Sequence, residues 1–255
     1  MFDESETVGR EYLRLLAGKG MGPQLFHQDN DAFYDLVRLR KRAAEFVAGS
    51  SLICRAKSGD REAAIALKTS FWPFVQEFEL AIDRQPLPRE PLARKFGDAA
   101  MRRVFVGMAR AIREMKSEEG SHAAHWRKDA ECLGISFFAD DRMPAVQELI
   151  DRAYTRDISL FFSMLAGTEF IAEELSRFLV DSQDFTGLFS RKRWMWGEIH
   201  LAPHDDGRSH LEIDLDLARA YGSEDASRIE ADVVSAMALF RKAADEIADA
   251  ALMSA

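Results

Sequence analysis

Apolar residues recur at every third or fourth position along most of this chain. No stretch of convincing length alternates apolar and polar residues as a half-buried strand does. Residues 32–49, for example, follow the N-capping residue Asp31 and carry Phe33, Leu36 and Val37 at helical spacing. A chain with helical patterns alone buries its apolar faces by packing helix on helix. We therefore expect an all-α protein.

The chain is long and apolar enough to bury a substantial core, since 47 % of its 255 residues are hydrophobic. No linker, repeat or low-complexity tract divides it, so we expect one domain over residues 1–255. Helices are predicted over residues 61–83 and 144–180, and a final amphipathic helix over 226–252. Pro73 should kink or restart the first of these, because proline lacks an amide donor.

Composition excludes several classes of protein. A net charge of −9 argues against a nucleic-acid-binding surface. The longest apolar stretch, Ile158 to Gly167, is too short to span a bilayer, and the acidic N-terminus does not resemble a signal peptide. Cys54 and Cys132 form neither a disulfide framework nor a Cys-x-x-Cys site. We expect a cytoplasmic protein that binds neither nucleic acid nor membrane.

Glu119 and His122 stand three residues apart within a long helical pattern from Asp98 to Leu133, so both side chains share one helix face. Carboxylate-bridged di-iron and di-manganese helical proteins use this spacing and take further ligands from facing helices. A lone Glu-x-x-His is a weak signal, because such pairs are common on helix surfaces. A second group of histidines strengthens it: His200, His204 and His210.

Acidic side chains also occur within apolar segments. Gln76, Glu77 and Glu79 lie among phenylalanines and a tryptophan, and Glu169 and Glu173 stand one turn apart in an apolar helical stretch. A buried carboxylate needs a partner, and a metal ion is one such partner. No thiolate accompanies these residues, which excludes a zinc–thiolate site, and a mixed Glu/His set spread over several helices suits iron or manganese.

With these stretches in view, the chain resembles the haem-oxygenase-fold iron proteins. These are the TenA/PqqC-like superfamily with its non-haem di-iron oxidases and oxygenases, including the alkene-forming fatty-acid decarboxylases. The resemblance covers roughly residues 63–240 and rests on four matching stretches: Trp72-Pro-Phe-Val-Gln-Glu-Phe, Glu119-Gly-Ser-His122, Thr168 to Glu173, and Trp196-Gly-Glu-Ile-His200.

This resemblance implies that Glu119, His122, Glu173 and His200 are metal ligands. The glutamate that the family has on its first metal helix falls on Gln76. Glu77 or Glu79 would therefore have to substitute, or that ligand is missing.

The family's closing His-x3-Asp-x2-His pattern falls on His200, His204 and Gly207. A helix bulge near this glycine would let Asp205, Asp206 or His210 complete the set. The departures leave open whether the chain binds two Fe(II) ions or one ion plus a labile second.

The resemblance implies one haem-oxygenase-like bundle of about seven or eight helices. It also implies a non-haem, di-iron oxidoreductase that uses dioxygen on a small organic acid or amino-acid-like substrate in biosynthesis. An external reductant and a homodimer are expected. The predicted substrate pocket comprises Gln76, Phe74, Phe162, Trp196 and His125. The alternatives are a metal-free member of the same fold, or a non-catalytic small-molecule-binding protein with a degenerate metal site.

Overall fold

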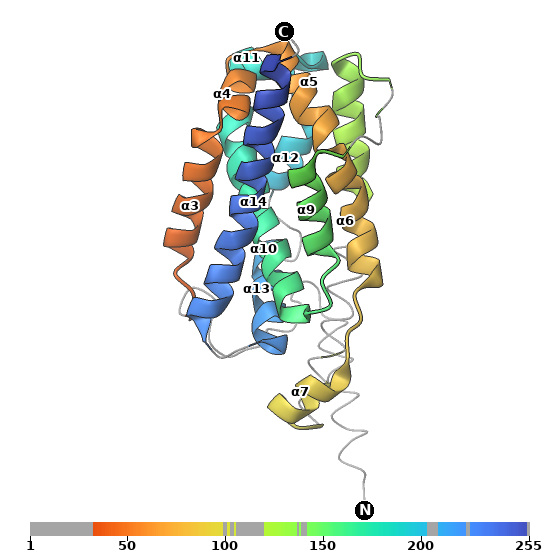
Figure 1. The fold of residues 1–255 in the computed structure, drawn as a ribbon, viewed down its shortest axis with the longest axis vertical. Coiled ribbons are helices and arrows are strands. Elements are labelled where there is room, and N and C mark those ends of the chain that lie inside the picture. The colour runs from red at the N-terminus through yellow and green to blue at the C-terminus, as the bar shows by residue number, and fades with distance from the viewer. Residues whose placement is uncertain are drawn as a thin grey trace, which may run out of the picture.

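The computed structural model describes residues 33–98, 101–102, 105, 120–136, 138, 142–202, 209–222 and 225–253 (Figure 1). Within these ranges the ordered elements are helices and no strand occurs, so the predicted all-α class is confirmed. The labelled helices are α3 (Leu36–Gly49), α4 (Ser51–Lys57), α5 (Arg61–Ser70), α6 (Trp72–Arg84), α7 (Arg89–Phe96), α9 (Pro144–Ala153), α10 (Ile158–Val180), α11 (Gln183–Thr186), the 3-10 turn η1 (Ser190–Lys192), α12 (Met195–Leu201), α13 (His210–Tyr221) and α14 (Ala226–Met253). Residues 120–132 are also helical and are called the His122 helix below.

The described part of the chain contains more helices than the resemblance implies. The expected helix over residues 61–83 is divided into α5 and α6, that over 144–180 is divided into α9 and α10, and α4 follows the expected end of α3 at Gly49. Ser50 ends α3 in extended backbone, and its hydroxyl accepts a hydrogen bond from the backbone N–H of Ile53, which begins α4. Phe71 separates α5 from α6, where Pro73 lies in the first turn. Proline is tolerated there, since the first-turn amides have no partner within the helix. Pro73 therefore restarts the helix.

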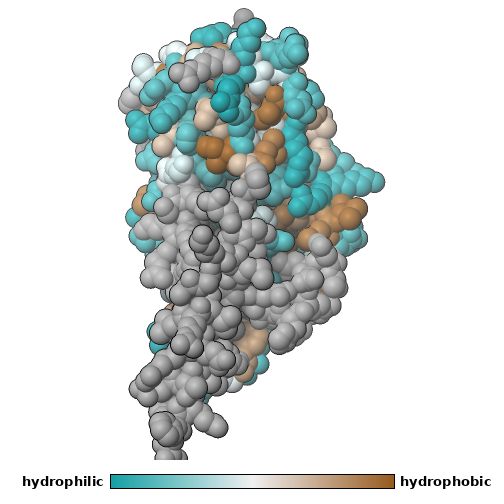
Figure 2. All heavy atoms as spheres, turned by 180° about the vertical axis from the view of Figure 1, so that it is seen from behind, coloured by the Kyte–Doolittle hydropathy of each residue, from teal (hydrophilic) through white to brown (hydrophobic). Residues whose placement is uncertain are grey.

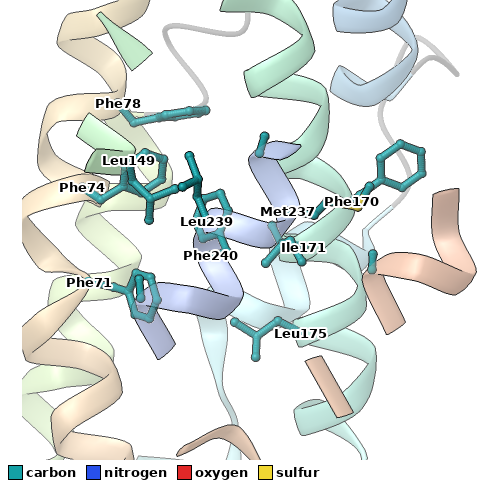
Figure 3. Close-up of a cluster of buried hydrophobic side chains, with 14 of the residues drawn as sticks. Phe71, Phe74, Phe78, Leu149, Phe170, Ile171, Leu175, Met237, Leu239 and Phe240 are labelled. Atoms are coloured by element: carbon teal, nitrogen blue, oxygen red, sulfur yellow. The ribbon is translucent and has the colours of Figure 1, made fainter. Parts of the chain in front are cut away.

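Helix α10 is the centre of the bundle and packs against α3, α12, α13 and α14 (Figure 1). Its residues from Phe161 to Gly167 are buried on every side, as expected for a helix that is apolar all round. A Cβ added at Gly167 would lie 2.7 Å from the Cβ of Ala236, so glycine permits the close approach of α14. Figure 3 shows the adjoining core, where Phe71 and Phe74 pack against Phe240 of α14, and Ile171 and Leu175 of α10 lie on the other side of α14.

The described surface seen in Figure 2 is mostly hydrophilic, with apolar areas between the hydrophilic residues. Among the described residues, no helix has the length and apolar character needed to cross a membrane. The elements that pack on α10 come from both the early and the late parts of the sequence. One domain over residues 1–255 stays a prediction.

Candidate functional site

Three imidazole rings gather beside α10, and each comes from a different segment. His122 belongs to the His122 helix, His200 to α12 and His210 to α13. The ring centroids of His122 and His200 are 4.3 Å apart, and those of His122 and His210 are 6.1 Å apart. His122 and His210 are buried and His200 is half-buried. The structure thus brings together three of the four described histidines.

Glu169 adds a carboxylate to this group from α10. Its Oε1 atom lies 3.7 Å from Nδ1 of His210, and only 8 % of Glu169 is exposed. A buried carboxylate favours a nearby positive charge, which either a protonated imidazole or a metal ion can supply. The cluster of His122, His200, His210 and Glu169 therefore draws its donors from four separate segments. This set is called the histidine cluster below.

The orientation of His200 is set by its own helix. Its Nδ1 lies 2.8 Å from the backbone oxygen of Trp196, and its ring lies 3.9 Å from the Trp196 ring, centroid to centroid. A carbonyl oxygen only accepts hydrogen bonds, so Nδ1 is the protonated nitrogen in this contact. The lone pair of the neutral ring is then on Nε2, which is the usual arrangement in metal-ligating histidines.

Two of the predicted ligands bind other protein groups instead. The Glu173 carboxylate accepts hydrogen bonds from Arg40 Nη1 at 2.8 Å and Arg177 Nη2 at 2.9 Å. Glu77 accepts a 2.6 Å bond from the Tyr154 hydroxyl, and burial together with this bond raises the pKa of Tyr154 to about 12. Glu77 also pairs with an arginine guanidinium. These two carboxylates are therefore occupied by protein partners.

Glu79 is the first-helix acid that approaches the His122 helix. A Cβ built on Gly120 would lie 3.2 Å from Glu79 Oε2, so this carboxylate is beside the residue that follows Glu119. Glu119, His204 and Asp206 lie outside the described residues, as does Asp205. Within the described ranges, no group of three or more His, Cys, Asp or Glu side chains is arranged to hold a metal ion. The predicted ligands outside the described residues stay predictions.

An apolar cavity of about 80 Å³ lies next to the histidine cluster. Trp196 is shared, since it lines the cavity and also contacts His200. Phe74 and Trp126 also line the cavity, and Arg241 is the charged residue of the lining. Two of the five predicted pocket residues, Phe74 and Trp196, therefore line this space.

The other three predicted pocket residues lie elsewhere. Gln76 is exposed, and Phe162 stacks on Tyr221 at 6.4 Å between ring centroids. His125 is half-buried on the His122 helix, and burial lowers its pKa. Their helical positions were correct, but the sequence does not show which neighbour each face meets.

Comparisons with known proteins identify the fold. No family model matches the chain, and no curated protein matches it. A solved TenA homologue from Pseudomonas syringae pv. tomato is similar in structure, with a TM-score of 0.55 over 92 % of this chain and 98 % of that chain. The chain has a TenA-like helical fold. Sequence identity is 15 %, so the likeness shows architecture alone. The predicted TenA/PqqC-like fold is thereby confirmed.

Proposed function

We propose that this TenA-like protein is a non-haem iron oxidoreductase that uses dioxygen to oxidise a small organic acid or amino-acid-like molecule in a biosynthetic pathway. One observation supports the proposal above all: His122 and His200, two predicted ligands from distant segments, lie with ring centroids 4.3 Å apart. His210 and Glu169 adjoin them inside the bundle. Fe(II), a reductant, a homodimer and a cytoplasmic location remain predictions.

The chemistry of the donor set fits iron. Imidazole nitrogen with carboxylate oxygen is a set that suits iron and manganese, and neither cysteine belongs to the histidine cluster: Cys54 is exposed and Cys132 contacts Ser190. A divalent cation bound by the lone pairs of neutral imidazole rings would also pair with the Glu169 carboxylate.

The residues of the chain would share the work as follows. His122, His200 and His210 would hold the metal with Glu169, and Glu119 or Glu79 would complete the set from the neighbouring helices. Bound Fe(II) would supply electrons for the reduction of dioxygen. The apolar cavity would bind the hydrocarbon part of the substrate and exclude water, and its charged lining residue, Arg241, is paired with Asp245.

A second candidate is a metal-free TenA-like enzyme or a non-catalytic small-molecule-binding protein. One observation favours it: the described residues contain no group of donors already arranged around an ion. In that case the apolar cavity would still bind a ligand, while the histidines would have a structural role.

Iron retention separates the two candidates. The protein is loaded anaerobically with ferrous iron, desalted and assayed for iron per chain. We expect one or two ions in the wild type and a strong loss in His122→Ala and His200→Ala. His125→Ala is the matched control, because it removes an imidazole one turn from His122 on the same helix but outside the histidine cluster. Wild-type protein that retains no iron supports the second candidate.

A further inference from the structure

Behind the histidine cluster lies a buried charged pair that no step of the proposed function uses. Lys68 on α5 is 1 % exposed, and Asp129 on the His122 helix is 3 % exposed. The Lys68 Nζ atom lies 3.6 Å from Asp129 Oδ2, a little beyond hydrogen-bonding distance. Burying an amine and a carboxylate away from water is costly unless both have partners, so the contacts of this pair show what it does.

Asp129 joins the His122 helix to α12. One of its carboxylate oxygens accepts a hydrogen bond from the backbone N–H of Met195 at 3.3 Å, and the other accepts from the N–H of Trp196 at 3.0 Å. These amides belong to the first turn of α12, where backbone donors lack partners within the helix. Two bonds from one rigid carboxylate fix both the position and the rotation of a short helix.

The same contacts connect directly to the histidines. Asp129 stands seven residues after His122, so two helical turns place both on one face. Trp196 stands four residues before His200, contacts its ring and accepts its Nδ1 hydrogen bond. The carboxylate of Asp129 thus links the helix that carries His122 to the helix that carries His200.

Lys68 lies against the Asp129 carboxylate and adds helix α5 to the contacts between the His122 helix and α12. Its Nζ lies 3.7 Å from the ring centroid of Trp126, a cation–π distance, and 5.3 Å from that of Trp194. The Trp126 indole N–H donates a 2.9 Å hydrogen bond to the backbone oxygen of Lys68. Helix α5 is therefore tied to the His122 helix at the level of Asp129.

We infer that Asp129, supported by Lys68, is the positioning residue that sets His200 against His122 and so determines the geometry of the proposed metal site. Asp129 touches no reacting atom; it acts through α12 and Trp196. The inference rests on the proposed function only for its effect on metal affinity. Its effect on the spacing of the two imidazoles in the metal-free protein rests on the hydrogen bonds of Asp129 and is independent of the proposed function.

Two measurements test this inference on the full chain. The first is the nuclear Overhauser effect between ring protons of His122 and His200 in metal-free protein, which reports the separation of the rings. The second is Co(II) affinity by titration of the visible absorption bands. We expect Asp129→Ala to lose the ring-to-ring signal and to bind Co(II) about 10–100-fold more weakly, as for other groups that orient metal ligands. Asp129→Asn keeps one acceptor oxygen. Its ring-to-ring signal and its Co(II) affinity should lie between those of Asp129→Ala and the wild type.

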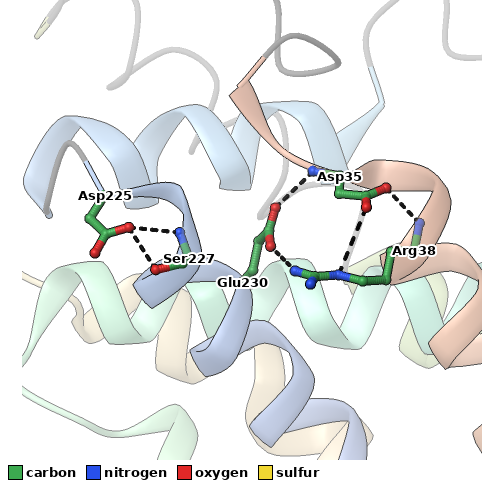
Figure 4. Close-up of polar contacts among 5 residues, drawn as sticks. All are labelled: Asp35, Arg38, Asp225, Ser227 and Glu230. Atoms are coloured by element: carbon green, nitrogen blue, oxygen red, sulfur yellow. Dashed lines mark hydrogen bonds and ion pairs between the residues drawn. The ribbon is translucent and has the colours of Figure 1, made fainter.

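Glu230→Gln is the matched control, since Glu230 is also a buried carboxylate, accepts a 2.7 Å bond from the Asp35 N–H and pairs with Arg38 (Figure 4). Glu230→Gln should lose about as much stability as the Asp129 variants, but it should keep the ring-to-ring signal and wild-type Co(II) binding. Lys68→Met tests the supporting cation and should weaken Co(II) binding less than Asp129→Ala. An Asp129→Ala or Asp129→Asn protein with wild-type ring contact overturns the inference. If the wild-type protein does not bind Co(II), the metal proposal is overturned instead. The ring-contact measurement still decides the role of Asp129.

Discussion

At the scale of single residues, the buried Lys68 makes the free energy of unfolding depend on pH. Burial lowers its pKa from 10.5 to about 7, although the Asp129 carboxylate opposes the shift. Between these values the unfolded chain binds a proton that the folded chain releases, so the free energy of unfolding rises with pH. We expect the wild type to gain up to about 1.4 kcal/mol per pH unit from this group over that window. Urea unfolding at several pH values measures the slope.

Lys68→Met removes the titrating amine and should flatten the slope by that amount. Tyr154 does not contribute to this slope in the lower part of the pH range, because its pKa is raised to about 12 and its hydroxyl stays neutral there. Equal slopes in the two proteins would show that Lys68 remains protonated when folded, and hence that the ion pair with Asp129 outweighs burial.

The residue scale also shows where sequence reasoning reached its limit at the site. Glu169 and Glu173 share an apolar helix face, and the sequence predicted inward-facing acids there. Arg177, four residues after Glu173, was the available signal that Glu173 pairs along its own helix. The second partner, Arg40 on α3, is distant in sequence, so its contact with Glu173 depends on tertiary packing that no local pattern reveals. His210 was a predicted candidate ligand, and its place beside His122 also depends on tertiary packing.

At the scale of elements, helical periodicity predicted the class and most helix positions, but not where α10 meets its neighbours. The contact at Gly167 shows the consequence. A Cβ there would meet Ala236 at 2.7 Å and the backbone oxygen of Val233 at 2.9 Å. Gly167→Ala should destabilise the protein by about 1–3 kcal/mol, because overpacking forces α10 and α14 apart. Urea unfolding measures the loss.

Gly49→Ala provides the control for this element. At that position an added Cβ meets the end of the flexible Arg241 side chain, which can move away. We expect a change within about 0.5 kcal/mol, since an ordinary surface substitution rarely exceeds that. If the two alanine variants unfold at the same urea concentration, the α10–α14 contact does not depend on glycine.

At the scale of the whole molecule, the histidine cluster joins segments that are far apart in the chain. His122, Glu169, His200 and His210 come from four segments, and a metal that binds them can bind only when all four are packed. Binding to the folded state alone stabilises by mass action, by about 2.7 kcal/mol when free metal is 100-fold above its dissociation constant. Co(II) should therefore raise the unfolding midpoint of the wild type and leave a His122→Ala/His200→Ala double variant unchanged. A shift of equal size in both proteins would place the bound metal elsewhere, because the double variant retains every acidic surface group while lacking two donors of the cluster.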